Sequence, residues 1–115
     1  MLRDKLEDLF ERQKELQKKF GNDLDGFNEE ERQQYTKDNI LGLLDETHEI
    51  LRETNWKHWR KTKKPVNPEN LKEEMADAFH FFINLCLAWD FSAVEIYEAY
   101  ISKDEEIYNR IKEDY

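Results

Sequence analysis

The sequence contains little cysteine, proline or glycine. Its 115 residues include one Cys, two Pro and three Gly. The single cysteine, Cys86, excludes a disulfide within the chain, and a reducing cytoplasm is the simplest setting for it. Few helix-breaking residues leave long stretches free to form helices. We therefore expect an all-α protein, and a chain of this length predicts a single domain over residues 1–115.

Long hydrophobic runs and an excess of basic residues are also absent. The most apolar segment, residues 78–91, is interrupted by polar side chains and is too short for a bilayer, which needs ~20 apolar residues. The amino terminus begins no apolar stretch, so we expect neither a signal peptide nor a membrane. The net charge is −9 and no basic stripe is present, which argues against a nucleic-acid polymer as partner. A small phosphate ligand held through metal ions remains compatible with this charge.

Apolar residues that recur every three or four positions predict four helices. We expect them over about residues 2–20, 29–58, 68–89 and 93–113, with a break near residues 38–39 or a bend at Gly42 in the second. Four helices with short connections predict a four- to five-helix bundle. The candidate core of the last helix consists of Ile96, Tyr97, Tyr100, Ile101, Ile107, Tyr108 and Ile111.

Three predicted helix starts carry capping signals. Asn28 and Ser92 are each followed three residues later by Glu, which is the capping-box pattern. Asn67 is followed by Pro68, a residue that fits the first helical position. A basic loop that includes both prolines precedes this third helix, so the second and third helices should form a hairpin.

Two pairs of acids have the spacing of metal ligands. Glu46 and Glu49 are three residues apart, as are Glu74 and Asp77, and residues three apart share one face of a helix. Both pairs flank apolar stripes, and a hairpin would place them opposite one another. Carboxylates that converge in this way repel and lose hydration unless a cation compensates, and Mg²⁺ prefers such oxygen ligands. In a chain with 27 acids, solvated surface carboxylates are the alternative interpretation.

The ordered combination of these motifs resembles a known superfamily. Asp45-Glu46-x-x-Glu49 followed by Glu74-x-x-Asp77 is similar to the EExxE…ExxD signature of all-α nucleoside triphosphate pyrophosphatases, the MazG-like proteins and dimeric dUTPases. Residues 55–59 (Asn-Trp-Lys-His-Trp), residues 77–81 (Asp-Ala-Phe-His-Phe) and the Tyr100-x-x-Lys103…Arg110…Tyr115 spacing resemble the dimeric dUTPase branch. The resemblance spans about residues 40–115. It departs from the family at Asp45, where the family has Glu, and at Ile107 and Ile111, where it usually has Asn and Gln.

The resemblance implies Mg²⁺-dependent hydrolysis of a nucleoside triphosphate to its monophosphate and pyrophosphate, with dUTP as the expected substrate and dCTP as another. Two or more Mg²⁺ ions, or Mn²⁺ in their place, would bind the four carboxylates named above. Asp45 and Glu49 would act in catalysis. It also implies a homodimer or a homotetramer. The remaining expected contacts are Lys57, Lys103 and Arg110 for phosphate, and Gln13, Asn22, His80, Phe81 and Asn84 for the base.

Other interpretations of the same residues remain open. Asp45-x-x-His48 and Asp77-x-x-His80 echo the acid-x-x-His pattern of di-iron bundles, although those sites use Glu. A non-catalytic helical protein that binds a nucleotide or a partner is a second alternative. Gln13 is also compatible with an amide at the edge of the core, and Phe81 with core packing.

Overall fold

The computed structural model describes residues 4–113, and in this range the chain forms helices and no strand. The elements are α1 (Lys5–Lys19), the short 3₁₀ helix η1 (Leu24–Gly26), α2 (Glu29–Arg52), α3 (Pro68–Ala88) and α4 (Ala93–Lys112). The all-α prediction is confirmed. Residues 2 and 3 of the predicted first helix lie outside the described range.

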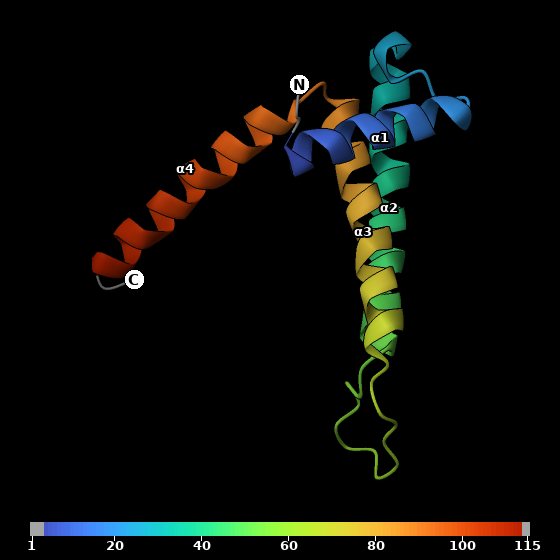
Figure 1. The fold of residues 1–115 in the computed structure, drawn as a ribbon, viewed down its shortest axis with the longest axis vertical. Helices are drawn as coiled ribbons and strands as arrows, with labels where there is room; N and C mark the ends of the chain where they lie inside the picture. The colour runs from blue at the N-terminus through green and yellow to red at the C-terminus, as the bar shows by residue number, and fades with distance from the viewer. Residues whose placement is uncertain (1–3, 114–115) are drawn as a thin grey trace.

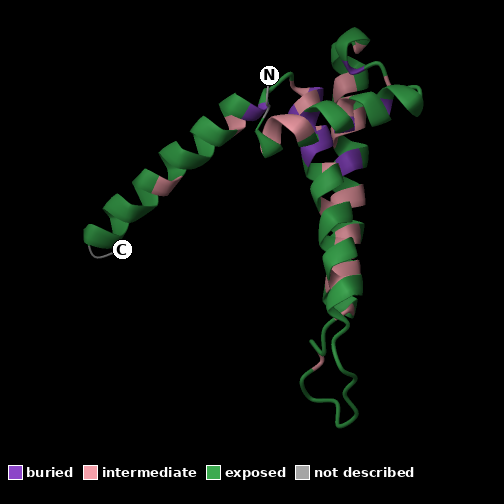
Figure 2. Ribbon diagram, viewed as in Figure 1, coloured by how far each residue is buried: buried purple, intermediate pink, exposed green. Residues whose placement is uncertain are grey.

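An antiparallel hairpin of α2 and α3 forms the long axis of the molecule (Figure 1). α1 crosses one end of this hairpin, and α4 leaves from the same end and projects away from it. The buried core is small and lies where α1, α3 and the start of α4 meet (Figure 2). It consists of Phe10, Ile83, Cys86 and Ala93, with Leu6, Leu87 and Ile96 packed against it.

The predicted caps are present at all three helix starts. The Asn28 and Ser92 side chains accept hydrogen bonds from the backbone N–H three residues later, and both capping boxes are complete. Asn67 accepts from the backbone N–H groups of Glu69 and Asn70. α1 has an additional cap, because the Asp4 carboxylate accepts from the Glu7 N–H at 2.8 Å. These bonds satisfy donors that every helix leaves without partners in its first turn.

The second helix differs from its prediction in where it ends and in the absence of a break. α2 ends at Arg52 rather than near residue 58, and it runs without a break at residues 38–39. After its end the Thr54 hydroxyl donates to the Leu51 carbonyl at 2.7 Å. The Asn55 side chain then bonds both backbone groups of Lys64, at 2.8 and 3.1 Å. These local side-chain bonds to the backbone compete with the helix and turn the chain into the loop.

The candidate core of the fourth helix is the largest error of the sequence analysis. Among its seven residues only Ile96 reaches the core, while Tyr100 is 70% exposed and Tyr97 59% exposed. The periodicity of these residues is helical, as predicted, but within one chain α4 packs mainly against α1 at its own first turns. An amphipathic stripe therefore predicts a buried face without indicating which surface buries it.

Within residues 4–113, no single helix is long and apolar enough to cross a bilayer. Only α3 and α4 taken together have the length and composition of a span, and these two helices are bent by 104° with respect to each other.

Candidate metal centre

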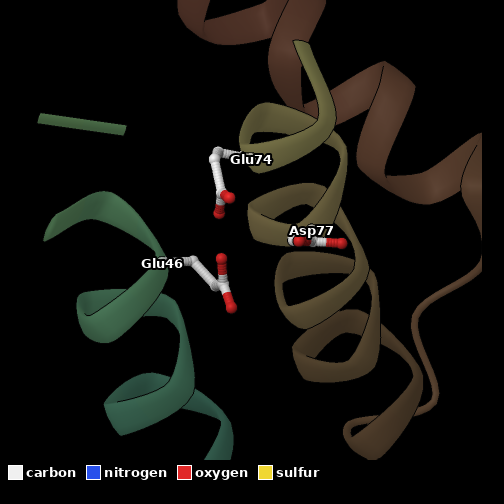
Figure 3. A group of neighbouring side chains, drawn as sticks. All are labelled: Glu46, Glu74 and Asp77. Carbon is white, nitrogen blue, oxygen red and sulfur yellow. The ribbon is translucent and has the colours of Figure 1, made fainter. Parts of the chain in front are cut away.

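Three carboxylates from the two hairpin helices converge on one point. Glu46 comes from α2, and Glu74 and Asp77 come from α3 (Figure 3). Each offers one oxygen, and these oxygens lie within 4.8 Å of one another. The spacing of Glu74 and Asp77 places both on the α3 face that is turned toward α2. Three of the four predicted metal ligands thus come together, and we call them the acid group.

The environment of Glu46 disfavours the charged form of its carboxyl. Its Oε2 atom is buried and has no hydrogen-bond partner among the described residues. Burial raises the pKa of the Glu46 carboxyl, and the neighbouring carboxyls of Glu74, Asp77 and Asp45 raise it further. A buried carboxylate oxygen without a donor is costly to desolvate. A cation among these acids would offset this cost.

The other two predicted acids of α2 lie beside the group. Glu49, one turn after Glu46, forms an ion pair with Arg52 on the same helix. Asp45 is exposed, and its charge contributes to the raised pKa of Glu46. The structure therefore does not bring Glu49 into the acid group, because the nearby guanidinium binds its carboxylate within the helix.

The loop after α2 forms a basic pocket that continues from the acid group's end of the hairpin. The pocket has a volume of about 610 Å³. Lys57 contributes to it, and its ammonium lies 5.2 Å from the centre of the Trp56 ring. The other basic residues that line it are Arg52, Arg60, Lys61, Lys63 and Lys64. The sequence analysis identified a basic loop here and assigned only Lys57 to phosphate, because the pocket depends on contacts that the loop makes in the fold.

Lys103 and Arg110 lie on α4, away from the acid group of the same chain (Figure 1). Both contact Glu106, with N–O distances of 3.2 Å for Lys103 and 2.6 Å for Arg110. The hydrogen bond from Lys103 and the two positive charges lower the pKa of the Glu106 carboxyl. One chain alone does not unite these two predicted phosphate contacts with Lys57.

A chain of buried amides links α1, α2 and α3. Gln13 Nε2 donates to Asn84 Oδ1 at 2.7 Å, and Asn84 Nδ2 donates to Asn39 Oδ1 at 2.8 Å. Asn39 Nδ2 then donates to the Tyr35 backbone carbonyl. Gln13 and Asn84 were predicted to contact a base, and the structure places them in contact with each other. Asn39 was not a predicted site residue, and no local spacing indicated its contact with Asn84.

A second polar cluster lies at the carboxyl end of α1. Gln17 Oε1 accepts from Asn22 Nδ2 at 2.9 Å and from the Tyr35 hydroxyl at 2.8 Å. Gln17 is buried, and the predicted base contact Asn22 is half-buried beside it. Gln17 was not a predicted site residue, and its position one helical turn after Gln13 is the signal that places both on one face.

The two remaining predicted base contacts lie on α3 beyond Asp77. His80 is exposed, and its Nδ1 atom lies 2.8 Å from the Ala76 carbonyl on the preceding turn. Phe81 packs against Gly42 of α2 so closely that a Cβ atom on Gly42 would lie 2.4 Å from the ring. The Phe81 ring thus fills the contact between the two hairpin helices.

An all-helical chain that presents carboxylates from two antiparallel helices fits the superfamily of dimeric dUTPases and MazG-like proteins. A family model described as dUTPase matches residues 5–92, and the chain belongs to this family. The family domain makes it a hydrolase, a nucleoside triphosphate diphosphatase, and supports dUTP diphosphatase activity. Such enzymes typically depend on a metal, and the acid group is a possible site for one. No curated protein and no solved structure gives a significant match.

Proposed function

We propose that the chain hydrolyses dUTP to dUMP and pyrophosphate at the acid group, with Mg²⁺ as the cofactor. The observation that carries this proposal is the unpartnered, buried Oε2 atom of Glu46 among the carboxylates of Glu74 and Asp77. All three donors are carboxylate oxygens, which suit a hard divalent cation. When bound, Mg²⁺ supplies positive charge that neutralises the phosphate oxygens and the acids that face them.

In this proposal all four predicted carboxylates remain ligands of the metal. Glu46, Glu74 and Asp77 would hold the cation, and Glu49 would join them if substrate phosphates took its place beside Arg52. Asp45, on the same turn as Glu46, orients the attacking water and accepts its proton. The water oxygen attacks the α-phosphorus, the bond from this phosphorus to the α–β bridging oxygen breaks, and pyrophosphate leaves. Positioning and charge are sufficient for this reaction, so no nucleophilic side chain is required.

The basic pocket supplies positive side chains that would bind the phosphates of the substrate in addition to the metal ion. Lys57 and its basic neighbours lie in the loop at the end of the hairpin, and a triphosphate bound at the acid group would extend toward them. Cationic side chains hold phosphate oxygens through charge-assisted hydrogen bonds. Lys103 and Arg110 would add to these contacts from a second copy of the chain. The residues that we propose to contact the base are Gln13, Asn22, His80, Phe81 and Asn84.

The alternatives make different predictions. A di-iron site would need histidine ligands, whereas the acid group contains only carboxylates and His80 Nδ1 contacts a backbone carbonyl. A purified protein with bound iron and visible absorbance would favour that alternative. A preference for dCTP would change the base contacts and leave the acid group in the same role. A non-catalytic binder would bind Mg²⁺ or nucleotide without turnover.

The direct test is to incubate the protein with Mg²⁺ and each deoxynucleoside triphosphate and to measure pyrophosphate and monophosphate. We expect release with dUTP. In water enriched in ¹⁸O the label should enter dUMP, because the attack is at the α-phosphorus. Label in pyrophosphate would contradict the mechanism, and no release with any nucleotide would refute the enzymatic function.

Paired variants test the site assignment. Glu74→Gln removes a charge from the acid group, whereas Glu73→Gln makes the same change at the neighbouring exposed position. We expect Glu74→Gln and Glu49→Ala to lose turnover, and Glu73→Gln to keep it. Binding of Mg²⁺ to the free protein, measured by calorimetry, should weaken in Glu74→Gln and not in Glu73→Gln. Full activity of Glu49→Ala would remove Glu49 from the site.

We further propose that the enzyme works as a homodimer in the cytoplasm. The resemblance to dimeric dUTPases and the exposed apolar residues support the dimer, and the single cysteine is compatible with a reducing compartment. A homotetramer is the alternative that a measurement of mass in solution distinguishes.

A further inference from the structure

The walls of the basic pocket come from one continuous stretch of chain. Its lining residues all lie between Arg52, which ends α2, and Pro65, which lies before the start of α3. Six of them are basic and one, Glu53, is acidic, so repulsion among the like charges favours an open loop. The pocket therefore keeps its shape only if contacts within this stretch hold the loop closed.

Asn55 closes this loop through two hydrogen bonds with one residue. Its Nδ2 atom donates to the Lys64 carbonyl at 2.8 Å, and its Oδ1 atom accepts from the Lys64 backbone N–H at 3.1 Å. The two residues are nine positions apart, so the bonds join the start of the loop to its end. An asparagine side chain offers a donor and an acceptor together, as a backbone peptide group does. We call this pair of bonds the Asn55–Lys64 contact.

The Asn55–Lys64 contact keeps the two sides of the pocket together. Lys57 lies on the first side, with its ammonium 5.2 Å from the centre of the Trp56 ring. Lys63 and Lys64 line the pocket from the part of the loop that returns toward α3. A single anion can contact lysines of both sides only while the loop is closed, because the two sides are neighbours in space and not in sequence. Closure therefore determines how many cations act on one ligand.

We propose that Asn55 is a positioning residue for polyphosphate binding, because it holds the loop closed so that Lys57 and the lysines opposite it act on one phosphate chain. Asn55 acts through the backbone of Lys64 and needs no contact with the substrate for this role. The inference rests on the proposed function, in which the basic pocket binds the phosphates of the substrate. Loop closure and phosphate binding are measured without turnover, so their results are separate from those of the dUTP assay.

The first test measures loop closure by trypsin cleavage of the full-length protein. Trypsin cuts after lysine and arginine, and the loop contains several of these residues. The rate of cleavage in a loop follows the fraction of molecules in which that loop is open. Asn55→Ala removes both bonds of the Asn55–Lys64 contact and should shift the balance between closed and open loop by about tenfold. We therefore expect the loop of this variant to be cut several-fold faster than that of the unaltered protein.

Two further variants make the cleavage result specific. Gln34→Ala also removes an exposed side-chain amide and its 2.8 Å bond, here to Asp38 on α2, and should be cut at the unaltered rate. Asn55→Leu keeps the volume of the side chain without its polar groups, and should be cut as fast as Asn55→Ala. Asn55 is exposed and lies outside the core, so helical circular dichroism should be retained in all three. Cleavage of Asn55→Ala at the unaltered rate would overturn the proposal.

The second test connects closure to phosphate binding. Inorganic triphosphate with Mg²⁺, measured by calorimetry, should bind Asn55→Ala several-fold more weakly than the unaltered protein or Gln34→Ala. With dUTP the KM should rise by a similar factor while kcat stays within about twofold, because an open loop lowers affinity and leaves the bound complex unchanged.

The outcomes of the two tests separate this role from the enzymatic function. Equal triphosphate affinity of Asn55→Ala and the unaltered protein would overturn the proposal, and so would a loss confined to kcat. An unaltered protein that shows no turnover, but the same differences in cleavage and triphosphate binding, would refute the enzymatic function and support the role of Asn55.

Discussion

Asn84 is the central residue of the buried amide chain, since it donates to Asn39 and accepts from Gln13. Asn84→Ala would leave a buried donor and a buried acceptor without partners. We expect a loss of about 2–4 kcal/mol in the free energy of unfolding, measured by urea denaturation. Asn109→Ala, at an exposed position of α4, should change it by no more than about 0.5 kcal/mol. Equal losses in both variants would show that the amide chain adds no stability of its own.

Tyr35 gives a prediction for alkaline pH. Burial raises the pKa of its hydroxyl from 10.0 to about 12, so the folded protein holds the neutral phenol more tightly than the unfolded chain does. The resulting stabilisation is complete below pH 10 and is lost as the pH rises from about 10 to 12. Denaturation at a series of pH values should therefore show the unaltered protein losing stability relative to Tyr35→Phe in this window. Parallel profiles for the two proteins would contradict the raised pKa.

At the scale of single residues, sequence reasoning predicted the convergence of the acids better than it predicted the other side-chain contacts. The acids Glu46, Glu74 and Asp77 were predicted to converge because helical spacing alone determines which residues share a face. The ion pair of Glu49 with Arg52 was not predicted. A flexible carboxylate has several possible partners at similar distances, and helical spacing does not indicate which of them it binds. The partners of Gln13 and Asn84 lie far along the chain on other helices, and local spacing contains no information about them.

At the scale of elements, Gly42 determines how closely α2 and α3 approach. A Cβ atom at this position would meet the Phe81 ring at 2.4 Å. Gly42→Ala should therefore destabilise the protein by about 1–2 kcal/mol, because the steric cost of overpacking exceeds the gain in helix propensity. The double variant Gly42→Ala with Phe81→Leu should recover part of the loss in thermal denaturation. Stabilisation by Gly42→Ala alone would mean that the ring can move aside freely.

Helix starts were predictable from the sequence, and one helix end was not. Asn28, Asn67 and Ser92 act on the backbone within three residues of themselves, so a local pattern is sufficient to place them. The end of α2 depends on Asn55 bonding Lys64 across the loop. Apolar periodicity that continues past Arg52 gives no sign of that contact.

At the scale of the whole molecule, the proposed homodimer predicts that stability depends on protein concentration. Unfolding of a dimer releases two chains, so the melting temperature should rise by several degrees when the concentration is raised a hundredfold. The variant Phe79→Glu, which places a charge on an exposed apolar residue of α3, should melt at a temperature that does not change with concentration. Calorimetry or circular dichroism at matched concentrations measures both, and a constant melting temperature for the unaltered protein would contradict an obligate dimer.

The whole-molecule arrangement was also the part that sequence reasoning predicted least well. A stripe such as Tyr97, Ile101 and Tyr108 demands a covering surface, and a four-helix bundle within one chain was the simplest one. The turn between α3 and α4, in which Asp90 adopts φ 58°, instead directs α4 away from the hairpin. The direction of a helix after a tight turn depends on a few backbone angles, which apolar periodicity does not encode.

The buried amides have a consequence for the acid group. Asn39 precedes Glu46 by two helical turns on α2, and Asn84 follows Asp77 by two turns on α3. The distance along the helix from the Asn39–Asn84 bond to the acid group is therefore the same on α2 as on α3. Sliding α3 along α2 by one turn, about 5.4 Å, would keep apolar residues against apolar residues but would break the bond between the amides. The bond between the two amides thus fixes the register of α2 against α3, and this register keeps the carboxylates opposite one another two helical turns away.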